Sequence, residues 1–175
     1  MDYLISSPFP ISLVQHPKQF ATIDEKAQYL DWSRDRIIKA IYCVHRDTSA
    51  LYLFVVPELG RIDFKKLRDN YSENLGFNPK KKLAFAEADQ LPPFMEDGTC
   101  NPFIPLDLNR VAAIMFDYQY VVKSYYQGGM DDFAIALNSR LNSHTLSLHM
   151  NYGDAHDLLK KHFPNIVRTM SLDYE

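Results

Sequence analysis

The stretch Ile37-Ile38-Lys39-Ala40-Ile41-Tyr42-Cys43-Val44 is the segment around which we expect the fold to be built. Alternate residues of a strand point to opposite faces of a sheet, and both sets are mainly apolar here. This pattern is typical of a strand that is covered on both sides. Lys39 interrupts the pattern, and lysine is seldom buried without a partner. Lys39 therefore either extends its ammonium to solvent near the start of the strand or points into a functional site.

Apolar runs that end at turn residues predict the other strands. They lie at residues 11–14, 51–56, 83–85, 111–116, 121–126 and 146–150. The run at 51–56 follows a short polar turn, so we expect it to form a hairpin with the Lys39 strand, which should be central in the sheet. Because hairpins alternate with helical crossovers, the sequence predicts an α/β (α+β) fold, a mixed sheet with helices packed around it.

Capping patterns and helical spacing predict helices at residues 22–31, 63–75, 86–91 and 154–163. Thr22 and Glu25 form a capping-box pattern at the start of the first helix. Asp63 should cap the second helix, whose apolar residues recur at helical spacing. Asp154 should open the last helix.

The composition limits the classes of function. The chain has 175 residues, of which 46% are hydrophobic, so we expect a single domain over residues 1–175 with its core at about 11–168. A net charge of −3 argues against DNA binding and against broad contact with RNA, but it permits contact with one RNA end. No apolar run is long enough to span a membrane, and the first residues lack a signal-peptide pattern. Cys43 and Cys100, the two cysteines, suit a cytoplasmic protein without disulfides.

A second stretch, Asp97-Gly98-Thr99-Cys100-Asn101-Pro102-Phe103-Ile104, is a candidate binding loop. Glycine, small polar residues and proline disfavour both helix and strand. The backbone N–H groups of such a loop can hold a carbonyl or phosphate oxygen, although an ordinary surface connection is the alternative. Cys100 could be a nucleophile only beside a base, so we interpret it as a small residue that lines the loop.

The common catalytic and cofactor motifs do not occur in the sequence. None of the six histidines has a partner at zinc-site spacing, and no nucleophile elbow, Walker loop or G-x-G-x-x-G motif is present. We therefore expect no metal and no bound cofactor. The lysines at residues 80–82 form either a solvated face or a contact for phosphate.

The order of these features resembles the YbaK/prolyl-tRNA-synthetase-associated editing domain family. That family begins with an H-P pair, a T-x-x-E-A-type helix and a V-V-K-T-L strand, and a D-L-K-K-L helix and a G-x-x-x-P loop follow. The resemblance covers about residues 13–163. The matching segments are His16-Pro17, the Thr22 helix, the Lys39 strand and residues 63–67, 83–86, 98–103, 116–117 and 128–129.

The resemblance implies a strongly curved mixed sheet with surrounding helices. It also implies a metal-independent deacylase that acts in trans and hydrolyses the ester joining a wrong, small amino acid to tRNA. Its partner would be the tRNA acceptor end, with an aminoacyl-tRNA synthetase as a further candidate. Lys39 and Gly98 would be catalytic. The loop amides could hold the carbonyl or its oxyanion, and the Lys39 ammonium could hold either that carbonyl or the terminal adenosine phosphate. The substrate-binding positions would be Thr99, Cys100, Asn101, Pro102, Phe103, Asp117 and Met130.

The sequence departs from the family pattern at four positions. Thr99 stands where a second glycine is common, Ile104 where a small residue is common, Ala40 where Thr or Asn is common, and Met130 where His or Arg is common. Thr99 and Met130 favour an alternative function, a non-catalytic relative that binds a tRNA end, an oligonucleotide or a protein partner. The intact Lys39 and the glycine–proline loop favour the hydrolase.

Overall fold

The computed structural model describes residues 4, 6–58, 61–66, 75, 77–93, 95, 100–103, 108–126, 133–136 and 145–174. Its strands are β1 (Ser12–Gln15), β2 (Ile37–His45), β3 (Leu51–Pro57), β4 (Leu83–Phe85), β5 (Val111–Asp117), β6 (Phe133–Ala136), β7 (Leu146–Met150) and β8 (Val167–Met170). Its helices are α2 (Ile23–Leu30), α4 (Pro79–Lys82), α5 (Tyr118–Tyr126) and α6 (Tyr152–His162), with short 3-10 turns η1 (Arg34–Arg36) and η2 (Ala88–Gln90).

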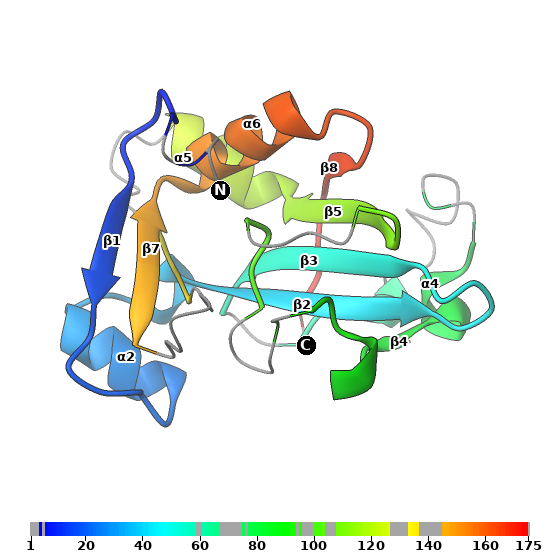
Figure 1. Cartoon of the computed structure of the whole chain (residues 1–175), viewed down its shortest axis with the longest axis horizontal. Coiled ribbons are helices and arrows are strands. Elements are labelled where there is room, and N and C mark those ends of the chain that lie inside the picture. The colour runs from blue at the N-terminus through cyan, green and yellow to red at the C-terminus, as the bar shows by residue number, and fades with distance from the viewer. Residues whose placement is uncertain are drawn as a thin grey trace.

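The described strands form one eight-stranded sheet in the order β1-β7-β6-β2-β3-β5-β8, and β4 pairs with β2 off this path. Antiparallel and parallel pairs both occur, so the sheet is mixed. Figure 1 shows that β1 and β7 run across the direction of β2 and β3, and that helices lie around this curved sheet. The predicted fold class is therefore confirmed.

Strand β2 is central, as predicted, and it forms the expected hairpin with β3. The two strands pair antiparallel from Ile38 opposite Pro57 to Val44 opposite Leu51. On its other edge, β2 pairs with β6 at residues 37–38 and with β4 at residues 43–45. Among the described strands, none continues this pairing along residues 39–41, so the sheet has a gap there.

Both faces of β2 are covered, as its apolar pattern predicts. On one face, Ile38 packs with Val55 and Phe116 beneath α5 and α6. On the other face, Cys43 packs with Phe54 in a cluster that includes residues near the C-terminus. Ile37 forms a third cluster with Ala27 of α2 on this second face. Lys39 lies on the same face as Ile37 and Cys43, between these two clusters.

The predicted helix starts at Thr22 and Asp63 are present. The Thr22 hydroxyl accepts a hydrogen bond from the Glu25 N–H at 3.1 Å, and α2 ends at Asp31, which has a left-handed backbone with φ of 54°. The Asp63 carboxylate accepts hydrogen bonds from the N–H groups of Lys65 and Lys66 at 2.9 and 3.1 Å. Most of the predicted 63–75 helix, including residues 67–74, lies outside the described residues.

The strand predicted at residues 121–126 is wrong, because this segment is the second half of helix α5. Its valines and tyrosines favour a strand by propensity. Tertiary packing overrides that preference, since Tyr120 and Val121 are both buried in the core that α5 shares with α6. The Asp117 carboxylate also accepts a hydrogen bond from the Gln119 N–H at 3.0 Å, which caps the first turn.

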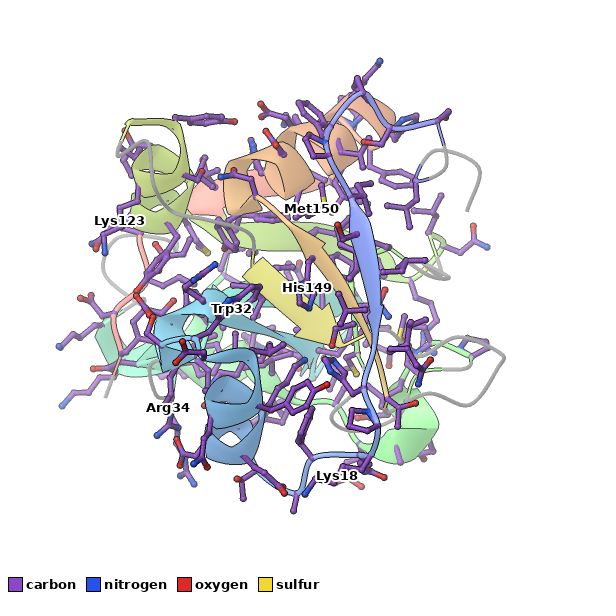
Figure 2. All side chains as sticks on the ribbon, turned by 90° about the vertical axis from the view of Figure 1, so that its left-hand side faces the viewer. Lys18, Trp32, Arg34, Lys123, His149 and Met150 are labelled. Carbon is purple, nitrogen blue, oxygen red and sulfur yellow. The ribbon has the colours of Figure 1, made fainter. Side chains whose placement is uncertain are left out.

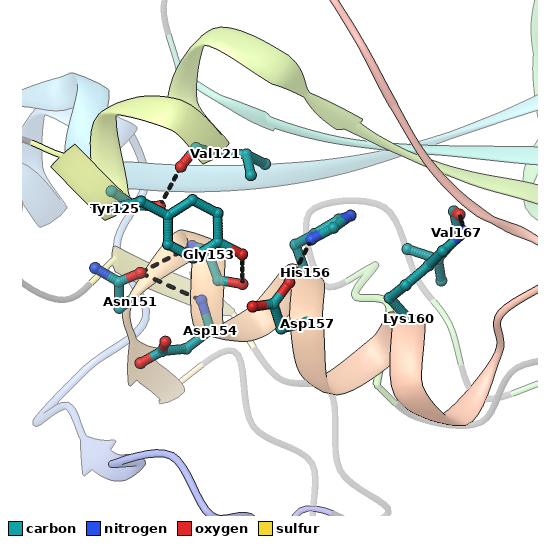
Figure 3. Close-up of polar contacts among 10 residues, drawn as sticks. Val121, Tyr125, Asn151, Gly153, Asp154, His156, Asp157, Lys160 and Val167 are labelled. Carbon is teal, nitrogen blue, oxygen red and sulfur yellow. Dashed lines mark hydrogen bonds and ion pairs between the residues drawn. The ribbon is translucent and has the colours of Figure 1, made fainter.

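The last helix begins earlier than predicted. Asn151, rather than Asp154, is the N-cap of α6, because its side-chain oxygen accepts hydrogen bonds from the N–H groups of Gly153 and Asp154 at 2.9 and 3.2 Å (Figure 3). Gly153 lies against Ser124 and Tyr125 of α5, and a Cβ atom at Gly153 would collide with Ser124. The glycine therefore allows the two helices to approach closely.

This correction predicts that Asn151→Ala lowers the free energy of unfolding by about 1 kcal/mol, the usual cost of losing an N-cap acceptor. Asn151→Asp should restore most of the loss, because a carboxylate accepts the same two N–H groups and is favourable at a helix N-terminus. Denaturant unfolding of the three proteins measures both effects. Equal losses for the alanine and aspartate variants would show that the cap contributes nothing.

Candidate functional site

A pocket of about 440 Å³ lies beside the gap along residues 39–41 of β2. Three separate segments meet the strand there. The lining residues are Gln19, Phe20, Ala21, Thr22, Ile23 and Lys26 at the start of α2, residues 37–41 of β2, Glu58 after β3, and Cys100. The pocket therefore exists because β4 and β6 each cover only one end of this edge of β2.

Lys39 points into this pocket. Its side chain is 23% exposed, and its Nζ donates a hydrogen bond to Oε1 of Glu58 at 3.1 Å. Glu58 also lies within 4.0 Å of Nη2 of Arg34. A charged side chain that lines a pocket and is held by an ion pair can present its ammonium to a carbonyl or phosphate oxygen. Lys39 is therefore a partly exposed residue that lines a pocket, and its role in a functional site stays a prediction.

Only one described residue of the candidate loop shares the pocket with Lys39. Cys100 lines it and is half-buried, whereas Gly98 and Thr99 lie outside the described residues. Asn101 is fully buried, and its side-chain oxygen accepts a hydrogen bond from the Phe103 N–H at 3.0 Å.

Pro102 and Phe103 lie elsewhere, in a small apolar space with Ile38, Val55 and Tyr152. Ile38 and Val55 belong to the face of the sheet that α5 and α6 cover. Phe103 is a core residue of the same cluster. The described part of the loop therefore has Cys100 at the pocket and Phe103 in the core, and both pack with the cluster that contains Ile38.

Asp117 and Met130 are not brought to the pocket by the described structure. Asp117 is buried, and its carboxylate accepts hydrogen bonds from the Gln119 N–H and, at 2.7 Å, from the Tyr174 hydroxyl. Burial raises the pKa of this carboxyl group. Its contacts indicate a structural role that joins α5 to the C-terminal segment. Met130 lies outside the described residues.

Lys26 is a pocket residue that the sequence analysis missed. It is only 7% exposed, and its Nζ donates a hydrogen bond to Oγ of Ser147 at 2.8 Å. Helical spacing could have revealed it, because positions 23, 26, 27 and 30 share one side of α2 and the other three are apolar. Lys26 also stands where the T-x-x-E-A pattern has alanine, a fifth departure.

Two buried histidines adjoin Lys26. Nε2 of His16 lies 2.7 Å from Oγ of Ser147, and the His149 ring lies 6.5 Å from that of His16 between centroids. Figure 2 shows His149 beside Trp32, whose ring centroid is 4.8 Å away. Burial and nearby cations lower the pKa of both histidines, that of His149 to about 4. Both imidazoles are therefore neutral at pH 7, and they supply no anion to Lys26.

Within the described ranges, no three His, Cys, Asp or Glu side chains gather as metal ligands would. No helix in these ranges has the length and hydropathy needed to cross a membrane.

The buried ammonium of Lys26 should lower the free energy of unfolding relative to an uncharged side chain at the same position. Burial lowers its pKa from 10.5 to about 8, which at 1.36 kcal/mol per pH unit corresponds to a cost of about 3 kcal/mol at pH 7. Lys26→Met removes this cost but also loses the hydrogen bond to Ser147, worth about 1 kcal/mol. We therefore expect Lys26→Met to raise the free energy of unfolding by about 2 kcal/mol at pH 7.

The direction in which the free energy of unfolding changes with pH tests whether the buried charge of Lys26 is the cause of this cost. The unfolded chain binds more protons than the folded protein between pH 8 and 10.5, so wild-type stability rises across this range and the advantage of Lys26→Met disappears. Denaturant unfolding from pH 7 to 10.5 measures both proteins, with Lys66→Met as the control because Lys66 is exposed. An advantage that did not change with pH would contradict the charge-based explanation.

Solved structures share this fold, whereas no protein-family model and no curated protein sequence matches the chain. A protein described as a candidate trans-editing enzyme for prolyl-tRNA synthetase has a TM-score of 0.61 and 18% identity, over 94% of this chain and 87% of the other. A hypothetical protein has a TM-score of 0.61 and 13% identity, over 98% and 96%. A scaffold protein from computational epitope grafting has a TM-score of 0.61 and 16% identity, over 94% and 87%. The likeness supports a distant fold relationship to trans-editing proteins.

Proposed function

We propose that the protein is an aminoacyl-tRNA deacylase that hydrolyses the ester of mischarged tRNA in trans. The observation that carries this proposal is the position of Lys39, which faces a 440 Å³ pocket at a gap in the sheet together with Cys100 of the candidate loop. The fold shared with a candidate trans-editing enzyme agrees with it. The partner would be the tRNA acceptor end, and the acyl group would occupy the pocket.

The chemistry asked of Lys39 is electrostatic. Attack on the ester carbonyl develops negative charge on its oxygen, and a fixed ammonium stabilises that charge most where water is excluded. Glu58, which also lines the pocket, would hold the ammonium in place through the 3.1 Å contact. The neighbouring 2′-hydroxyl of the terminal ribose, or water, would be the nucleophile. The N–H groups of the candidate loop would be the second set of donors to the oxyanion.

A second candidate function is a binding module of the same fold. The Lys39–Glu58 ion pair favours it, because an ammonium that is already neutralised stabilises a developing oxyanion less than a free one. Such a protein would hold the same tRNA end without turnover. Deacylation measured on a panel of mischarged tRNAs separates the two functions, and lack of turnover combined with binding would select the second.

If Lys39 acts on the transition state, Lys39→Ala should slow deacylation about 100–1000-fold, equal to about 2.7–4 kcal/mol of barrier, as for removal of one oxyanion donor. Lys39→Arg should recover only part of the rate, because a planar guanidinium does not replace a compact ammonium. Steady-state deacylation of Ala-, Ser- and Cys-tRNA measures the rates.

Lys65→Ala is the matched control for this measurement, because Lys65 is an exposed lysine that does not line the pocket. Thermal unfolding must accompany the kinetics, since removal of a half-buried lysine also changes stability. Equal rates for wild type and Lys39→Ala would remove Lys39 from the mechanism.

Affinity for RNA should depend only weakly on salt, because two lysines of the basic runs at residues 80–82 and 160–161 are already engaged within the protein. Lys82 is paired with Asp47. Lys160 donates hydrogen bonds to the carbonyl oxygens of Pro164 and Val167 at 2.8 and 2.7 Å, and Figure 3 shows Lys160 and Val167 at the end of α6. Lys81 and Lys161 are exposed.

With about two phosphate contacts, the slope of log K against log salt should be about −1.4 for single-stranded RNA. The Lys81→Gln, Lys161→Gln double variant should weaken binding and flatten this slope. Fluorescence titration of a single-stranded RNA that carries the 3′-terminal sequence of a tRNA, at several salt concentrations, measures it. A slope as steep as that of a multi-contact DNA-binding protein would contradict the expectation.

A further inference from the structure

The charges that line the pocket do not cancel. Lys26, Lys39 and Glu58 are the charged residues among the described lining residues. Glu58 contacts Lys39 at 3.1 Å, whereas the polar partner of the Lys26 ammonium is the hydroxyl of Ser147. Among the described lining residues there is therefore one positive charge in excess, and it belongs to the more deeply buried of the two lysines.

Within the described part of the chain, the groups that face Lys26 from neighbouring elements do not supply a negative charge. His16 precedes α2, Ser147 and His149 belong to β7, and all three are uncharged at pH 7. Arg36 of η1 stacks on Trp32 at 4.0 Å and adds a further positive charge near His149. A buried ammonium without a carboxylate is unfavourable unless a ligand supplies the anion.

We propose that Lys26 is an anion-recognition residue of the pocket, and that the ligand places a carboxylate or phosphate group against its ammonium. Nothing in the proposed deacylase chemistry requires this residue, since Lys39 alone was assigned to the carbonyl. The identity of the anion rests on the proposed function. It would be either the side-chain carboxylate of an aspartyl or glutamyl group or the phosphate of the terminal adenosine.

The depth of Lys26 favours the carboxylate. Its side chain is 7% exposed and lies against Ser147 and the apolar residues of α2. A terminal acyl side chain can enter such a position, whereas the phosphate of the last nucleotide is joined to the rest of the RNA and stays nearer the mouth of the pocket. Lys26 would then select acidic acyl groups over the smaller, uncharged alanyl or seryl groups.

Three non-hydrolysable probes test the proposal by binding alone. They are 3′-aspartylamino-3′-deoxyadenosine, its alanyl counterpart and adenosine 5′-monophosphate, titrated calorimetrically into wild type, Lys26→Met and Lys66→Met. We expect wild type and Lys66→Met to bind the aspartyl probe at least 10-fold more tightly than the alanyl probe. Lys26→Met should bind both alike. Lys26-dependent binding of adenosine monophosphate, with equal binding of the two acyl probes, would assign the anion to phosphate.

Side-chain NMR of Lys26 gives an independent reading. A bound anion stabilises the ammonium, so the pKa of Lys26, about 8 in the free protein, should rise by at least one pH unit with the anionic probe and stay unchanged with the alanyl probe. The proposal is overturned if every probe binds wild type and Lys26→Met equally. It is also overturned if none binds wild type at millimolar concentration.

These outcomes are separate from those that test deacylation. Lys26-dependent binding of an anionic probe without turnover of any tRNA would leave Lys26 as an anion site in a binding module. Turnover of Asp-tRNA and Ala-tRNA that is lost equally in Lys39→Ala, but unchanged in Lys26→Met, would leave the deacylase standing and remove this role for Lys26.

Discussion

The incomplete pairing of β2 is the constraint on which the rest of the described site depends. A central strand must bury both faces and pair both edges, because unpaired backbone groups are costly away from water. Here β3 pairs one edge along seven residue pairs, whereas β4 and β6 cover only the two ends of the other. The gap at residues 39–41 lets segments from α2, from the end of β3 and from the loop at Cys100 meet one stretch of backbone.

The two lysines of the pocket show how environment decides the role of one residue type. Lys39 lies on a strand, is partly exposed and forms an ion pair with a carboxylate, so little free energy is lost in keeping it charged. Lys26 lies on the inner side of a helix and meets a hydroxyl, so burial opposes its charge. Proteins often keep such unfavourable groups at functional sites, at the expense of stability. Of the two lysines, Lys26 is therefore the one whose burial points more clearly to a function.

Local patterns predicted the fold well where they agreed with packing. The apolar residues of β2 and β3 and the capping residues Thr22 and Asp63 all lie as expected. The pattern failed at residues 121–126, because β-branched and aromatic residues suit either a strand or a helix that packs in a core. It also missed β6 and β8, which are four-residue strands. Pairing with neighbours far along the chain defines such short strands.

The sequence by itself determined the central strand, its hairpin partner, the caps Thr22 and Asp63, and the presence of a lysine where an apolar residue was expected. Only the tertiary structure decided which residues share the pocket. It placed Cys100 at the pocket that Lys39 also lines and Phe103 in the core beneath α5 and α6, and it brought Lys26 to Ser147, 121 residues away along the chain. Spacing along a chain reports on one helix or strand at a time, whereas a pocket forms where the sheet brings distant segments together.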